Sequence, residues 1–104
     1  MEFKAETKDD VCEAVVEGEL TIYHAGEFKK GLEKAVKKAT NINLDLANVS
    51  EIDTSCIQLL MQAQNGCLEN GRELVITAVS QPVREVLDIF GMERHFGDLD
   101  KVGS

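Results

Sequence analysis

The chain has 104 residues, 43% of them hydrophobic and 29% charged, and a net charge of −8 from 19 acidic and 11 basic residues. This length suffices for one hydrophobic core, so we expect a single domain over residues 1–104. The acidic balance, without any stripe of basic residues, disfavours binding to nucleic acids or anionic membranes. A protein partner with a basic docking face suits the chain better.

No segment of the sequence predicts export or membrane insertion. The opening MEFKAETKDD is polar and acidic, and no apolar run approaches the roughly 20 residues that span a bilayer. The cysteines Cys12, Cys56 and Cys67 show no C-x-x-C spacing, and the last two stand about three helical turns apart. We therefore expect buried free thiols in a reducing cytosol.

The N-terminal part predicts a hairpin followed by a helix. The β-branched run Val11–Val16 predicts a first strand, Glu17-Gly18 a turn and Glu19–Tyr23 a second strand. From Glu27 the apolar period becomes helical, with lysines around the opposite face. The apolar face of this helix consists of Phe28, Leu32, Ala35, Val36 and Ala39.

The middle of the chain predicts a strand and a second helix. Apolar Ile42, Leu44 and Leu46 alternate with Asn43, Asp45 and Ala47, which is typical of a strand. A helix should run from about Thr54 to Glu69, where apolar residues recur at helical spacing. The pair Asn70-Gly71 closes it, because helices often end on a left-handed residue.

The last part predicts a buried strand over Leu74–Val79 and a third helix. Ser80 caps this helix, Pro82 is tolerated in its first turn, and Gly91 ends it. Its apolar stripe consists of Val83, Val86, Leu87 and Phe90. The order β-β-α-β-α-β-α predicts an α/β fold, in which helices pack on a mixed, mainly parallel four-stranded sheet.

Residues that bind metals or cofactors form no recognisable site in the sequence. There is no glycine-rich phosphate loop, and the two histidines stand in no metal-ligand spacing. A magnesium site could be drawn from Asp45, Glu51 and Asp53, but a solvated Glu51 and a helix-capping Asp53 are favoured. Ser55 has no histidine or lysine at the spacing of a hydrolase. We therefore expect no cofactor, no metal and no enzymatic activity.

Asp53, Thr54 and Ser55 stand together at the expected start of the second helix. A hydroxyl there lies beside free backbone N–H groups and the positive end of the helix dipole. That position is favourable for a serine to gain and hold a phosphate. Most such triplets are only helix caps, so a regulatory interpretation depends on the surrounding sequence.

Four segments together resemble the STAS domain family, which includes anti-sigma-factor antagonists and the cytoplasmic tails of sulphate transporters. They are Gly18–Leu20, Asn43–Leu46, Ile52–Ser55 and Gly71–Ile76, and the stretch Val79–Leu87 is similar as well. The likeness covers about residues 10–97. It implies a bacterial, cytoplasmic protein-interaction module.

In anti-sigma-factor antagonists, the second hydroxyl residue after the aspartate is phosphorylated by an anti-sigma factor that is also a serine kinase. The resemblance makes Ser55 the acceptor, Thr54 the less favoured alternative and Asp53 the helix cap beside the site. The unphosphorylated form binds the kinase and phosphate breaks the complex, while ATP and its metal belong to the partner. The expected partner surface consists of Thr21, Ile22, Tyr23, Thr54, Ser55, Cys56, Gln58, Ser80, Gln81 and Pro82.

Two positions depart from the family pattern. Cys56 stands where glycine often follows the acceptor, and Thr21 stands where aspartate is common after Gly-Glu-Leu. These departures suggest a partner other than the sporulation-type kinase. Related STAS proteins also serve in stressosomes, so the resemblance leaves that context open. The alternative function is a docking subunit that is not phosphorylated, in a chemotaxis cluster or a phospholipid-transport ABC system. A small enzyme or ligand binder is the third hypothesis.

Overall fold

The computed structural model describes residues 1–89 and 91, and it contains a four-stranded sheet with the order β1-β2-β3-β4. β1 is antiparallel to β2, whereas β2, β3 and β4 run parallel. The strands are β1 (Glu2–Lys8), β2 (Val11–Leu20), β3 (Asn41–Ile52) and β4 (Glu73–Val79). The helices are the 3-10 helix η1 (Ile22–His24), α1 (Ala25–Lys38), α2 (Thr54–Glu69) and α3 (Gln81–Ile89).

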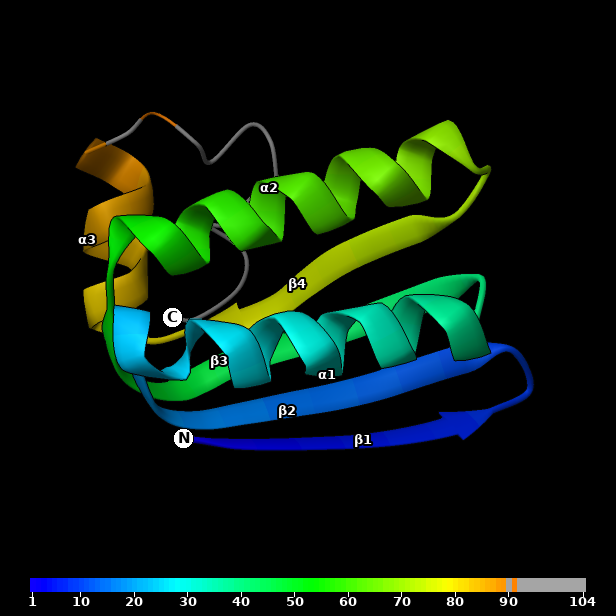
Figure 1. Cartoon of the computed structure of the whole chain (residues 1–104), viewed down its shortest axis with the longest axis horizontal. Coiled ribbons are helices and arrows are strands. Elements are labelled where there is room, and N and C mark those ends of the chain that lie inside the picture. The colour runs from blue at the N-terminus through cyan, green and yellow to red at the C-terminus, as the bar shows by residue number, and fades with distance from the viewer. Residues whose placement is uncertain (90, 92–104) are drawn as a thin grey trace.

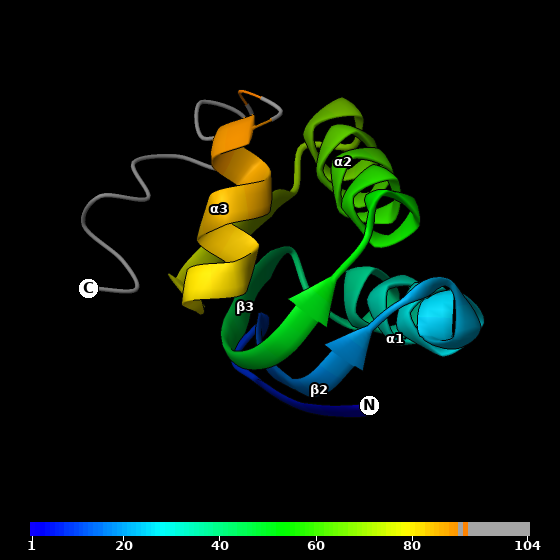
Figure 2. The same cartoon turned by 90° about the vertical axis from the view of Figure 1, so that its left-hand side faces the viewer.

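The helices cover the sheet in the way that parallel connections require. α1 connects β2 to β3 and α2 connects β3 to β4, and the two helices lie side by side over one face (Figures 1 and 2). α3 packs against β3, at the end of the molecule where α2 begins (Figure 1). The mixed, mainly parallel sheet confirms the predicted α/β fold. Phe90, expected in the apolar stripe of α3, lies outside the described residues.

The N-terminal hairpin forms, but the sequence prediction placed it at the wrong residues. Its strands are β1 and β2, joined at Asp9 and Asp10, whose φ angles are 52° and 66°. Short polar residues tolerate this left-handed conformation, which two-residue hairpin turns require. Gly18, with φ of 94°, makes no turn but lies inside β2, beside a shift in its register with β3. Residues 22 and 23, predicted as strand, belong to η1.

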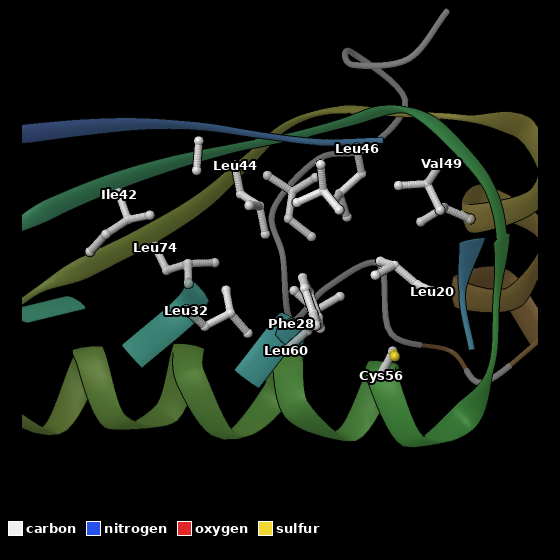
Figure 3. Packing of buried hydrophobic residues seen from close by; sticks show 14 of the residues in the cluster. Leu20, Phe28, Leu32, Ile42, Leu44, Leu46, Val49, Cys56, Leu60 and Leu74 are labelled. Carbon is white, nitrogen blue, oxygen red and sulfur yellow. The ribbon is translucent and has the colours of Figure 1, made fainter. Parts of the chain in front are cut away.

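The core lies between the sheet and the helices, and it includes Val83 and Leu87 of α3. Leu44 and Leu46 of β3 point from the sheet toward the helices, where Phe28 of α1 and Leu60 of α2 lie, and all four side chains are buried (Figure 3). Cys12, Cys56 and Cys67 are buried in this core and make no disulfide, which confirms the predicted free thiols (Figure 3 labels Cys56). Among the described residues, no helix is long and apolar enough to cross a membrane.

The edge strand β1 is held to α1 by an aromatic side chain packed on a glycine. A Cβ atom added at Gly31 would lie 2.7 Å from the ring of Phe3, and that ring contacts Phe28 with centroids 6.2 Å apart. Gly31→Ala should therefore displace the ring. We expect the free energy of unfolding to fall by up to about 2 kcal/mol, because overpacking outweighs the gain in helix propensity. Denaturant unfolding measures this change.

Gly66 in α2 is the matched control for this prediction. A Cβ atom there meets no other atom within 4 Å, so Gly66→Ala adds helix propensity without a clash. We expect this variant to gain about 0.5–1 kcal/mol. If Gly31→Ala stabilises the protein as much as Gly66→Ala does, Phe3 does not pack on Gly31 in solution.

Candidate functional site

Asp53 begins α2 as its N-cap, as the sequence predicts. Its backbone is extended, and its Oδ1 accepts hydrogen bonds from the N–H groups of Ser55 at 3.1 Å and Cys56 at 3.4 Å. Its own N–H donates to the carbonyl of Leu20, at the end of β2, over 3.0 Å. Two neighbouring strands therefore position the first turn of α2.

Ser55 lies in this first turn, half-buried, and its hydroxyl donates to Asp53 Oδ1 over 2.5 Å. The sequence prediction that a hydroxyl here faces free backbone N–H groups is wrong in one respect. The N–H groups of Ser55 and Cys56 already donate to the Asp53 carboxylate. Thr54, the alternative acceptor, is exposed beside them.

The electrostatics of the site favour a charged Asp53. Burial of the carboxyl raises its pKa, but hydrogen bonds from the Ser55 hydroxyl and from the N–H groups of Cys56, Ile22 and Ser55 lower it by more. The pKa of Asp53 therefore lies below its usual range. The resulting carboxylate holds the Ser55 hydroxyl and the start of α2 at neutral pH.

Removal of this carboxylate should destabilise the fold in a pH-dependent way. Asp53→Ala should lower the free energy of unfolding at neutral pH by about 0.5–2 kcal/mol, the usual cost of losing an N-cap. Because the pKa of Asp53 is lower in the folded protein than in the unfolded chain, its contribution is complete above the unfolded value and is lost as pH falls through the folded value. Denaturant unfolding from about pH 7 down to about pH 2 should show the gap between wild type and variant closing in acid. A gap that stays constant would contradict the charged cap.

Helix η1 lies directly against the start of α2 and presents two apolar side chains to solvent. Ile22 and Tyr23 are 66% and 90% exposed, while the N–H of Ile22 stabilises the charge on Asp53. The sequence analysis placed both residues in the partner surface, and their exposure leaves them accessible to a partner. It did not predict their link to Asp53, which joins positions about 30 residues apart.

Cys56 was predicted as part of the partner surface, and this is wrong because its side chain is completely buried. Its Sγ lies 3.7 Å from the carbonyl oxygen of Thr21, to which it donates, so it fastens η1 to α2. Burial, reinforced by the charge of Asp53, raises the pKa of this thiol. Cys56 is therefore a packing residue and not a reactive thiolate.

The remaining predicted interface residues lie on α2 and at the start of α3. Gln58 is exposed one turn further along α2. Ser80 caps α3 as predicted, because its Oγ accepts from the N–H of Val83 at 3.4 Å, and its own N–H donates to Leu46 at 3.1 Å. β4 thus ends level with Leu46, six residues before β3 ends at Ile52. In the described part of the chain, no hydrogen bond joins Ser80, Gln81 or Pro82 to Ser55.

The carboxylates that could be drawn as a magnesium site have separate roles. Asp45 accepts a hydrogen bond from the N–H of Ala47 at 2.8 Å, Glu51 is exposed, and Asp53 caps α2. Within residues 1–89 and 91, no group of three His, Cys, Asp or Glu side chains could hold a metal ion. The favoured alternative of a solvated Glu51 and a capping Asp53 is confirmed.

The fold agrees with comparisons to known proteins. The family model described as Mlab, STAS domain, matches residues 3–101. The chain belongs to the STAS domain family. An anti-sigma-B factor antagonist of Staphylococcus epidermidis is 31% identical to this STAS chain over 88 residues, which cover 84% of the chain and 82% of the relative.

Solved structures of similar proteins superpose on most of the chain. A putative anti-sigma factor antagonist of Thermotoga maritima superposes with a TM-score of 0.78 and 24% identity, covering 88% of this chain and 80% of its own. The Bacillus cell fate determinant SpoIIAA in its phosphorylated form superposes with a TM-score of 0.71 and 17% identity, covering 89% and 86%. At these identities the superpositions show the shared fold.

Proposed function

We propose that this STAS domain is a protein-interaction switch of the anti-sigma-factor-antagonist type, controlled by phosphorylation of Ser55. The observation that carries the proposal is the place of Ser55 in the first turn of α2, with its hydroxyl held by Asp53 and the exposed Ile22 and Tyr23 close by. The curated relative with 31% identity, an anti-sigma-B factor antagonist, supports it. The domain then binds its partner in the bacterial cytoplasm and catalyses no reaction itself.

A phosphate on Ser55 would change the surface more than the fold. It would carry about two negative charges at neutral pH. The nearest backbone donors already serve Asp53, so the phosphate would find a carboxylate beside it and would have to turn toward solvent or the partner. A partner surface shaped for a neutral hydroxyl would then face an unpaired dianion, which strongly disfavours the complex.

The partner in this proposal is a serine kinase that also acts as an anti-sigma factor, or a related signalling protein. It binds the unphosphorylated domain and later transfers phosphate to Ser55. ATP and its metal belong to that partner, so the STAS domain itself supplies the acceptor hydroxyl and the docking surface. Ile22 and Tyr23 supply apolar contact area at the edge of the site.

Phosphate mapping in native cells tests the acceptor. We expect intact-mass and fragment spectra of the purified protein to place one phosphate on Ser55. That phosphate should be absent from Ser55→Ala and retained in Thr54→Ala, the matched variant at the neighbouring hydroxyl. Loss of phosphate in Thr54→Ala alone would make Thr54 the acceptor, and phosphate on neither residue would contradict the switch.

The second candidate function is a docking subunit that is never phosphorylated, in a chemotaxis cluster or a phospholipid-transport ABC system. The observation that favours it is the hydrogen bond from Ser55 to Asp53, which serves the helix start without any phosphate. In that case Ser55 only supports the N-cap of α2, and the surface around η1 stays bound to the larger complex.

A further inference from the structure

A groove of about 440 Å³ lies between α1 and α2 and opens to solvent along the two helices, which run side by side in Figure 1. Half-buried apolar side chains form its floor: Val36 from α1, and Leu59 and Ala63 from α2. It begins one turn beyond Ser55 on α2 and extends away from the phosphorylation site. These three side chains pack against the core on one side, and the part of each that stays exposed faces the groove.

The two walls of the groove differ in charge. α1 carries five lysines and two glutamates in a chain whose net charge is −8, whereas α2 carries a single charged residue, Glu69. Lys29 and Lys37 stand at the groove eight positions apart, about 12 Å along the helix. Neither makes an ion pair with another described residue, although Glu33 stands between them. The groove therefore offers two unpaired positive charges above an apolar floor.

The floor also contains a glycine whose position the fold does not explain. Gly66 lies inside α2, where glycine weakens a helix relative to alanine. A Cβ atom at this position would meet nothing within 4 Å, so no neighbouring side chain requires the glycine. The open space above Gly66 permits close approach of a partner's side chain or backbone.

We infer that the groove between α1 and α2 is a second docking surface, and that its occupant is an acidic amphipathic helix of a partner protein. Such a helix would place its apolar stripe on the floor and acidic residues seven or eight positions apart against Lys29 and Lys37. A small amphiphilic ligand fits less well, because ligand pockets enclose about 70–90% of their ligand and this groove is open along its length.

Titration of the isotope-labelled full chain with synthetic peptides tests the inference. The probes are peptides of about 16 residues with a leucine–alanine stripe and glutamates seven or eight positions apart, and matched peptides with lysines in place of the glutamates. At near-physiological salt we expect an acidic peptide to bind with a Kd below about 1 mM. Its chemical-shift changes should gather at Val36, Ala63 and Gly66, and the lysine peptides should bind about tenfold more weakly or worse.

Charge-reversed variants distinguish binding in the groove from general electrostatic attraction to α1. Lys29→Glu with Lys37→Glu should weaken the acidic peptide about tenfold or more. Lys30→Glu with Lys34→Glu makes the same charge change on α1 outside the groove and should weaken it less than about threefold. Equal losses in the two variants would overturn the inference, and so would binding of lysine peptides as strong as that of the acidic ones.

Two further variants test whether peptide binding depends on the groove and not on the phosphorylation site. Gly66→Leu should abolish peptide binding while the amide spectrum stays that of a folded protein. Ser55→Asp should leave peptide affinity within about twofold of wild type, since the groove lies outside the phosphorylation site. Absence of binding by every acidic peptide at about 1 mM, or shift changes centred on η1, would overturn the second docking surface.

Discussion

Ser55→Asp is expected to weaken binding of the signalling partner by about tenfold or more, while the free energy of unfolding changes by less than about 1 kcal/mol. A carboxylate in the first turn of α2 gains about 0.3–1 kcal/mol from the helix dipole. It also stands beside the charged Asp53 and removes the hydroxyl that donates to it, which offsets this gain. Burial of the added charge in an interface, without a cation, costs about 2 kcal/mol or more. Titration calorimetry with the captured partner and denaturant unfolding measure the two effects separately.

Two variants control for the size and the charge of the substitution. Ser55→Ala removes the hydroxyl without adding charge, so it should keep partner binding and lose phosphate incorporation. Asn65→Asp adds the same charge at an exposed position of α2 beyond Ser55 and should leave affinity within about twofold. If Ser55→Asp and Ser55→Ala both bind like wild type, the unphosphorylated docking subunit becomes the better description of this STAS domain.

Most of the fold could be predicted because its buried elements carry clear apolar periodicity. α2 begins at Thr54 and ends at Glu69, as its pattern indicates, and Gly71 takes the left-handed conformation expected after it. β1 was missed because it is an edge strand whose residues are exposed on nearly every position, so its sequence shows neither an apolar run nor an apolar face. Gly18 misled the hairpin prediction, since a glycine in a bulged strand looks the same in sequence as a glycine in a turn.

The candidate site divides into a local part, which the sequence predicts, and a tertiary part, which it does not. The cap of Asp53 and the place of Ser55 depend on three consecutive residues. The burial of Cys56 depends on Thr21, which lies 35 residues earlier and reaches it only because β2 and β3 end side by side. Ser80 lies level with Leu46 and not with the end of β3, because β4 is shorter than β3. The alternation of apolar residues in the two strands does not predict this difference in length.

Truncation of the exposed side chains of η1 should affect the complex strongly and the fold little. We expect the double variant Ile22→Ala with Tyr23→Ala to lose about 2 kcal/mol or more of binding free energy, roughly 30-fold in Kd. Large apolar and aromatic side chains beside a central polar site are typical of residues that dominate interface energies. The unfolding free energy should change by less than about 0.5 kcal/mol, because both side chains are mainly in solvent and the N–H of Ile22 near Asp53 remains.

Leu68→Ala is the matched control, since Leu68 is a similarly exposed apolar residue, 64% accessible, in the last turn of α2. This variant should bind the partner like wild type, and its unfolding free energy should likewise change little. The comparison distinguishes specific docking around Ser55 from nonspecific hydrophobic binding to exposed apolar side chains. If Leu68→Ala loses as much partner affinity as the η1 double variant, the partner does not dock specifically beside Ser55. Loss from η1 alone, combined with the loss in Ser55→Asp, would place the apolar contacts and the phosphorylatable hydroxyl in one interface.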